Sequence, residues 1–370
     1  MMFAMSTLDP LFKHVVEKGA SDLHLVSRSQ PKMRQHGVIR NIDGQPVVTA
    51  DTLKKYLMEI APPALWKEFE AISDIDFAYE LEGVGRFRCN YFMDANGPAA
   101  VFRVISNKVP TIEDLKLSPV LAELCQLKKG LVLVTGPTGS GKSTTLAALL
   151  DHVNKTRADH IITIEDPIEF IYESKNCLIS QREVHRHTDS FKKALRAALR
   201  EDPNVVLIGE MRDLETVEIA LETAETGHLV FATLHTTTAA SAVDRVIDQF
   251  PSTQQNQIRA MLASSLKAVV AQALCKTADG KARVAAFEIL IVNSAVAANI
   301  RDSKTHQLAS MIQVGQGMGM RLLNDSLLEL LKKGAIDAME AYVNAVDKKD
   351  IYLRIKEQGF PLDVGKLSGA

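Results

Sequence analysis

Apolar positions along the chain follow two different patterns, one before about residue 105 and one after about Leu121. The first pattern mixes short helical stripes with alternating strands, which predicts a small α/β domain. The second repeats apolar strands followed by helical sequence, which predicts a mostly parallel sheet covered on both faces. Ligands bind at the carboxyl ends of the strands in sheets of this kind. We therefore expect an α/β chain whose chemistry lies mainly in its second region.

The first region begins with a helical face between Leu8 and Val16 that closes at Gly19. A further helix is expected over 51–60, and the expected strands are 22–26, 75–81, 85–93 and 99–105, with a turn at 94–97 between the last two. A polar segment flanked by prolines follows, as is typical of a linker. We expect an N-terminal domain over 1–106, a linker over 107–119, a second domain over 120–357 and a disordered tail over 358–370.

The second region shows the strand–helix alternation most clearly. Its expected strands are 131–135, 160–164, 205–208, 229–234 and 284–292, and the sequence after them reads as helical. The glycine-rich segment 315–320 follows no strand, so we expect a loop between helices there rather than a nucleotide-binding turn.

Composition and charge limit the classes of protein to which the chain can belong. The 370 residues are 46% hydrophobic with a formal net charge of −2, so no overall charge attracts nucleic acid. The first residues lack a basic region followed by an apolar core, so we expect no secretory signal there. No uncharged apolar run reaches the ~18 residues of a membrane span; the best candidate, 285–300, is interrupted by Glu288 and Asn293. The cysteines lie far apart, which favours buried free thiols in a reducing compartment: Cys89, Cys125, Cys177 and Cys275.

A phosphate-binding loop follows the strand 131–135. Gly136, Gly141, Lys142 and Ser143 fill the pattern G-x-x-x-x-G-K-[ST], and helical sequence follows directly. Backbone amides and the helix dipole favour the phosphates of a nucleoside triphosphate such as ATP. Lys142 is expected to reach the β- and γ-phosphates, and Ser143 to ligate Mg²⁺. The whole binding loop comprises Gly136, Pro137, Thr138, Gly139, Ser140, Gly141, Lys142, Ser143 and Thr144.

Three carboxylates follow the next strand, at Glu165, Asp166 and Glu169. Because they repel one another, we expect a cation or a cationic side chain among them. With a P-loop nearby, Glu165 and Asp166 are candidate Mg²⁺ partners, and Glu169 is a candidate for handling the attacking water. The alternative is a solvated acidic turn.

The apolar strand 205–208 leads to Glu210, as in a Walker B element. Gly209 stands where an aspartate usually holds Mg²⁺ through water, so the preceding acidic segment is expected to supply that carboxylate. Glu210 is then expected to orient or deprotonate the attacking water. The alternative is a purely structural glutamate.

A histidine stands at each end of the strand 229–234. His228 and His235 are ordinary strand-end residues in one interpretation. In the other, one of them senses the γ-phosphate and passes its presence to the following helix, which places His228 among the nucleotide-binding residues and His235 among the catalytic ones. The sequence leaves both interpretations open.

Arginines at 86, 88 and 103 lie on adjacent expected strands of the first domain. Such residues often serve solubility alone. The alternative is that they are arginine fingers, which raise turnover by about 10³–10⁵ where they have been measured.

Together these segments resemble the type II/IV secretion ATPases, and among them the chain is similar to type IV pilus retraction ATPases of the twitching-motility kind. The similarity covers almost all of 5–357, and its specific segments are 19–24, 136–143, 164–169, 181–183, 209–213 and 228–235. One departure concerns 295–301, where Ala297 replaces the first arginine of Ala-Ile-Arg-Asn-Leu-Ile-Arg while Arg301 remains. This leaves open whether the chain is a principal retraction motor or its accessory paralogue.

The resemblance implies a small PAS-like α/β domain, a RecA-like P-loop domain with a helical C-terminal region, and a homohexamer whose domains move as ATP is hydrolysed. It implies that Arg88 and Arg103 reach the nucleotide phosphates. It also implies a cytoplasmic motor, peripheral at the inner membrane, that drives pilus retraction and has as partners a pilus platform protein and a paralogous retraction ATPase, but no nucleic acid. The alternatives are an assembly or type II secretion motor, an accessory paralogue with weak hydrolysis, and a nucleotide-gated adaptor.

Overall fold

The computed structural model describes residues 6–35, 37–105 and 109–363. Contacts between Cα atoms divide the chain into two compact units, which are described separately. The first unit holds residues 1–108 and 169–171, and the second holds residues 109–168 and 172–370.

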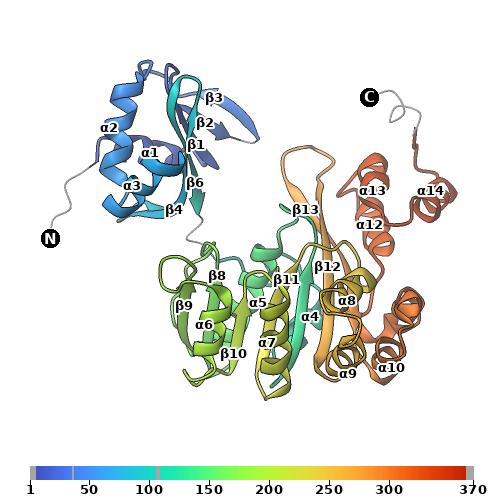
Figure 1. Cartoon of the computed structure of the whole chain (residues 1–370). Coiled ribbons are helices and arrows are strands. Elements are labelled where there is room, and N and C mark those ends of the chain that lie inside the picture. Colours follow the sequence, from blue (N-terminus) through green and yellow to red (C-terminus); the bar gives the residue numbers. More distant parts are fainter. Residues whose placement is uncertain (1–5, 36, 106–108, 364–370) are drawn as a thin grey trace. The chain divides into compact units, whose positions relative to one another are not determined.

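The first unit is built on an antiparallel sheet with strand order β3-β2-β1-β6-β5-β4 (Figure 1). Its strands are β1 (Asp22–Val26), β2 (Lys32–Gln35), β3 (Val38–Asn41), β4 (Asp74–Leu81), β5 (Gly85–Asp94) and β6 (Gly97–Ile105). The helices α1 (Asp9–Glu17), α2 (Ala50–Ile60) and α3 (Pro63–Ile72) pack on one face of this sheet. On β5 the side chains of Phe87, Cys89 and Tyr91 enter that core. Because strand residues alternate, Arg88 lies on the opposite face.

The second unit is built on a sheet with strand order β13-β12-β7-β11-β10-β8-β9, parallel except for β13. Its strands are β7 (Gly130–Thr135), β8 (His160–Glu165), β9 (Leu178–Glu183), β10 (Val205–Ile208), β11 (Leu229–Leu234), β12 (Leu266–Lys276) and β13 (Arg283–Ile291). Alternate residues of β7 enter different cores, Leu131 and Leu133 on one face and Val132 and Val134 on the other. Both faces are therefore covered, as parallel sheets require.

Helices α4 (Pro119–Leu124) and α5 (Lys142–Thr156) cover one face of the second sheet. The other face is covered by α6 (Phe191–Ala198), α7 (Leu214–Glu225), α8 (Ala239–Asp248), α9 (Gln255–Ser265), α10 (Ser294–Arg301) and α11 (Leu308–Val314). Short 3₁₀ turns, η1 (Thr305–Gln307) and η2 (Gly315–Met318), flank α11. The last helices, α12 (Leu323–Lys332), α13 (Ala338–Asn344) and α14 (Lys348–Glu357), form a smaller core with Cys275 and Ala286.

These elements confirm the predicted α/β class, with an N-terminal domain followed by a parallel-sheet domain. The expected buried thiols are also confirmed. Five elements were not predicted from the sequence: β2, β3, β9, β12 and α3. The expected loop at 315–320 contains the turn η2.

The expected linker differs from what the structure describes. From residue 109 on, this segment belongs to the second unit, since Ile112 and Leu117 are only 7% and 8% exposed within its core. Residues 107 and 108 lie outside the described residues. Of the expected tail, 364–370 also lies outside them, while Phe360 packs against the C-terminal helical core. The predicted limits of the domains otherwise stay predictions.

Candidate nucleotide-binding site

The loop 136–144 joins the end of β7 to the first turn of α5. Gly136 has a φ of +147°, and a Cβ there would lie 2.4 Å from the backbone oxygen of Gln272 and 2.5 Å from Oγ of Ser140. Only glycine fits this close approach. Nζ of Lys142 donates to the carbonyl oxygens of Gly136 at 2.9 Å and Pro137 at 3.2 Å. The ammonium group is therefore held against the loop, where phosphate oxygens can replace these carbonyls.

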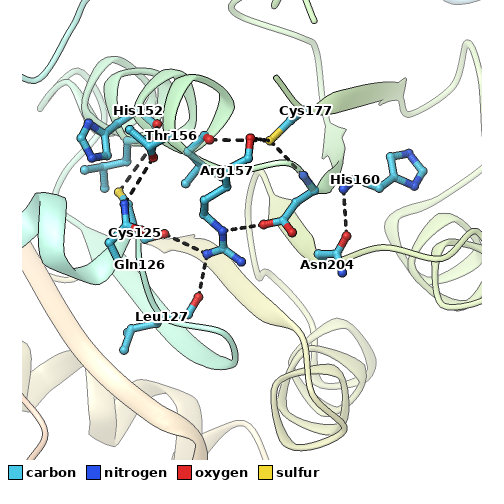
Figure 2. A network of polar contacts seen from close by, with 12 residues as sticks. Cys125, Gln126, Leu127, His152, Thr156, Arg157, His160, Cys177 and Asn204 are labelled. Atoms are coloured by element: carbon cyan, nitrogen blue, oxygen red, sulfur yellow. Dashed lines mark hydrogen bonds and ion pairs between the residues drawn. The ribbon is translucent and has the colours of Figure 1, made fainter. Parts of the chain in front are cut away.

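The opposite end of α5 is fixed by Arg157 (Figure 2). Its NH1 atom donates to the carbonyl oxygens of Cys125 at 2.8 Å and Leu127 at 2.7 Å, and its Nε pairs with Asp159 at 2.5 Å. Sγ of Cys177 donates to the carbonyl oxygen of Arg157 at 3.2 Å. One guanidinium thus joins the end of the P-loop helix to α4 and to the residue before β8.

The acidic segment begins where β8 ends. Glu165 is 7% exposed, and its Oε1 accepts hydrogen bonds from Thr163 at 2.7 Å and Gln181 at 3.4 Å. The amide of Gly209 donates to the carbonyl oxygen of Ile164 at 2.8 Å. A Cβ at Gly209 would lie 3.2 Å from both that oxygen and Cα of Glu165. Glycine at this position therefore lets the chain after β10 approach Glu165 closely, which an aspartate would hinder.

Glu210 lies between two basic side chains. Its Oε1 is 2.9 Å from Nε2 of His235, and its Oε2 is 2.7 Å from NH2 of Arg212. Burial raises the pKa of Glu210, but the hydrogen bonds and charges of Arg212 and His235 outweigh burial, so this pKa lies below its ordinary value. Arg212 also interacts electrostatically with Asp166, so a cationic side chain does lie near the acidic segment.

The register of β11 separates the two histidines. β11 runs parallel to β7, with Leu234 opposite Thr135 and Leu229 opposite Gly130. His235 therefore lies at the P-loop edge of the sheet, while the carbonyl of His228 accepts a hydrogen bond from Gly130 at 3.0 Å at the other edge. Six strand residues span about 20 Å. The predicted nucleotide-binding role of His228 does not fit this geometry, since its imidazole instead bonds to the carbonyl oxygen of Thr223 at 3.0 Å.

By its contacts, Glu169 belongs to the first unit, whereas the P-loop belongs to the second. Residues 169–171 belong by their contacts to the first unit, whereas Glu165 and Glu210 end neighbouring strands of the second. The structure therefore brings Glu165, Asp166, Glu210 and His235 to one sheet edge, and the role of Glu169 stays a prediction.

The arginines lie on the helix-free face of the first unit. Arg88 and Arg103 are directly opposite each other on β5 and β6. Nε of Arg88 donates to Asp76 at 3.0 Å, and Nε of Arg103 donates to Asp22 at 3.0 Å. The side chain of Arg103 is 66% exposed. Each guanidinium is thus oriented by a carboxylate and stays available to solvent, while Arg86 is buried.

Gln272, beside the P-loop, was not predicted from the sequence. It lies on β12, which pairs with β7, and its Nε2 donates to the carbonyl oxygen of Ser140 at 2.5 Å. The only sequence signal was a glutamine inside an otherwise apolar run of a strand that we did not predict.

Comparison with known proteins confirms the resemblance seen in the motifs. The model of the family described as type II/IV secretion system protein matches residues 2–348. The type IV pilus retraction ATPase PilT of Pseudomonas aeruginosa is 50% identical over 325 residues, covering 88% of this chain and 94% of that protein. The type IV pilus ATPase PilU of the same organism is 38% identical over 348 residues, covering 94% and 91%.

A solved structure is also similar over nearly the whole chain. The pilus retraction motor PilT with bound ADP has a TM-score of 0.87 and 42% identity, and the match covers 94% of this chain and 99% of that one. No helix among the described residues is long and apolar enough to cross a membrane. By its family match and its identity to these relatives, the chain belongs to the type II/IV secretion system protein family.

Proposed function

We propose that this protein is an ATP-hydrolysing motor that powers type IV pilus retraction and twitching motility. The observation that carries the proposal is the 50% identity to the retraction ATPase PilT over 88% of the chain. The solved PilT structure with bound ADP supports nucleotide binding, since this chain has the complete loop 136–144 between β7 and α5.

In this proposal the P-loop amides and Lys142 bind the phosphates. The ammonium of Lys142 leaves the carbonyl oxygens of Gly136 and Pro137 for the β- and γ-phosphates. The carbonyl oxygens are neutral acceptors and the phosphate oxygens are charged. Because charge-assisted hydrogen bonds are stronger, this exchange favours binding of the nucleotide.

Mg²⁺ is proposed to be held by Ser143 at the start of α5 together with Glu165 and Asp166. Hydroxyl and carboxylate oxygens are the hard ligands that this ion prefers, and it is usually bound by one or two carboxylates plus substrate phosphates. The residues present fit these needs, since Glu165 ends β8 at the P-loop edge of the sheet and Asp166 follows it directly. An ion held by these residues would supply positive charge that offsets the charge of the phosphates.

Glu210 is proposed to orient the attacking water. Its lowered pKa keeps the carboxylate ionised at neutral pH, which favours accepting a hydrogen bond from water over strong general-base catalysis. Phosphoryl transfer needs little proton abstraction early on, so orientation is enough. Glu169 is proposed to assist, and His235 holds Glu210 in place through its 2.9 Å contact.

Arg88 and Arg103 are proposed to stabilise charge on the transferred phosphoryl group. The two residues are directly opposite each other in the sheet, and their guanidinium groups are planar and always charged. Movement of the first domain with nucleotide state would then couple hydrolysis to force. We propose a homohexamer that acts at the cytoplasmic face of the inner membrane on a pilus platform protein, alongside a paralogous retraction ATPase.

A principal motor is favoured over the accessory paralogue. Identity to PilT exceeds identity to PilU, 50% against 38%. The carboxylates at Glu165 and Glu210 also favour an active enzyme over a nucleotide-gated adaptor. Relatives named as type II secretion system protein E match less of the chain; that of Aeromonas hydrophila covers 43%.

The test is phosphate release by the purified full chain with Mg²⁺ and ATP. We expect steady-state turnover in the wild type and none above background in Lys142→Ala. The substitution removes a phosphate contact at the edge of the sheet, so thermal unfolding should change little. Turnover of Lys142→Ala equal to wild type would refute the proposed site, and a wild type that binds ATP without hydrolysing it would favour the adaptor.

A further inference from the structure

Gln272 is a buried amide beside the P-loop that the mechanism above does not use. It is 3% exposed, and it lies on β12 one residue beyond Ala271, which is opposite Thr135 at the end of β7. In a buried side-chain amide, both the oxygen and the NH₂ group usually have hydrogen-bond partners, because a buried polar atom without a partner costs free energy.

The side chain and the backbone oxygen of Gln272 both lie against the loop. Nε2 donates to the carbonyl oxygen of Ser140 at 2.5 Å. A Cβ at Gly141 would lie 3.2 Å from that nitrogen, and a Cβ at Gly136 would lie 2.4 Å from the backbone oxygen of Gln272. The first and last glycines of the loop thus both lie close to Gln272.

The bond to Ser140 fixes the peptide plane between Ser140 and Gly141. In a trans peptide the carbonyl and the following N–H point in opposite directions. Because the carbonyl of Ser140 is directed toward Gln272, the N–H of Gly141 is directed away from it. That N–H belongs to the N-cap of α5, at the helix end where phosphate oxygens bind.

We infer that Gln272 is a positioning residue for nucleotide phosphate, and that it acts by holding the Ser140–Gly141 peptide with its amide aimed into the phosphate site. This inference rests on the proposed nucleotide binding and adds a residue outside the P-loop motif. Oε1 of Gln272 and Oγ of Ser140 have no hydrogen-bond partner among the described residues. Both are polar atoms next to the loop whose bonding can change when the loop binds its ligand.

The test uses Gln272→Met, which keeps the length of the side chain and removes its donor. We expect about tenfold weaker binding of a fluorescent ATP analogue, as for loss of one buried hydrogen bond. KM for ATP should rise by a similar factor with a smaller change in kcat, since positioning of bound phosphate affects the ground and transition states alike. The matched control is Gln255→Met. Nε2 of Gln255 also donates to a backbone carbonyl oxygen, that of Phe250 at 3.1 Å, but neither residue belongs to the loop.

A second variant, Gln272→Glu, separates positioning from packing. It has the same shape but lacks the donor and adds negative charge beside the phosphate site, so we expect a loss of affinity greater than in Gln272→Met. ATP-analogue affinity in Gln272→Glu equal to wild type would overturn the inference, whether or not Gln272→Met folds. A wild type without nucleotide affinity would instead refute the proposed function, so the two failures are distinguishable.

Discussion

Nε2 of His235 lies 2.9 Å from Oε1 of Glu210. These residues follow the neighbouring parallel strands β11 and β10, so the pair joins two strand ends at the P-loop edge of the sheet. After His235 the chain leads through Thr238, the N-cap of α8, into that helix. The carboxylate of Glu210 is therefore linked by one hydrogen bond and a short length of chain to a helix packed in the core.

The first prediction concerns that carboxylate. Glu210→Gln keeps the size of the side chain and an oxygen that can accept from His235, but it removes the charge that orients water. We expect ATP binding to persist and turnover to fall by about 10²-fold or more, as for the loss of correct reactant positioning. Single-turnover hydrolysis and ATP-analogue titration of the full chain measure the two quantities separately.

Glu201→Gln is the matched control for this experiment. Glu201 also pairs with an arginine, Arg182 at 2.9 Å, but lies before β10 rather than after it. Its variant should hydrolyse ATP as the wild type does. If Glu210→Gln loses ATP affinity while each bound ATP is hydrolysed at the normal rate, Glu210 is a binding residue instead.

The second prediction concerns stability and pH. Glu288 on β13 is 6% exposed and accepts from the amides of Ala239 at 2.8 Å and Leu323 at 3.5 Å. Burial raises its pKa, and those two hydrogen bonds oppose the rise without cancelling it. The folded state thus holds this proton more tightly than the unfolded state does, so Glu288 makes stability fall as pH rises above its ordinary pKa of about 4.3.

Glu288→Gln removes this titration and keeps an acceptor for Ala239. We expect the free energy of unfolding of the variant, relative to wild type, to increase between about pH 4 and pH 7. Urea unfolding at several pH values measures the difference. A difference that is constant with pH, or that decreases, would show that Glu288 does not titrate as the structure indicates.

The third prediction tests the arginine fingers. Arg103→Ala should lower turnover by about 10³ or more while nucleotide binding and the oligomer persist, because a finger acts on charge that develops in the transition state. Arg34→Ala is the control, since Arg34 lies on the same sheet and also pairs with Asp22, at 3.7 Å. Equal turnover in the two variants would show that Arg103 is an ordinary surface charge.

Sequence patterns predicted the strands that carry the P-loop and the acidic residues, because these strands are short apolar runs bounded by polar turns. β12 was missed for a physical reason. The helix α9 is followed directly by β12 at Leu266, with no glycine or proline between them. The Ala, Leu, Lys and Gln residues of β12 also favour a helix. Gln272 could not be assigned to the site without that strand.

The sequence predicted a mostly parallel sheet but not which strands pair. It left both His228 and His235 as candidates, and the parallel pairing of β11 with β7 places only His235 at the P-loop edge. The strands β2, β3 and β9, of which β3 and β9 lie at sheet edges, were missed because their residues are mostly half-exposed or exposed and show little apolar alternation. The sequence showed that Gly209 stands where a carboxylate is usual. That Gly209 lies close to Glu165 could be seen only in the structure.

The most direct test of the central claim is imaging of labelled pili on living cells of the source organism in which the chromosomal gene carries Lys142→Ala. If the chain is a retraction motor, pili still extend, do not retract and accumulate, and twitching stops. Retraction at the wild-type rate would contradict this claim, and so would cells without pili, which would indicate an assembly motor.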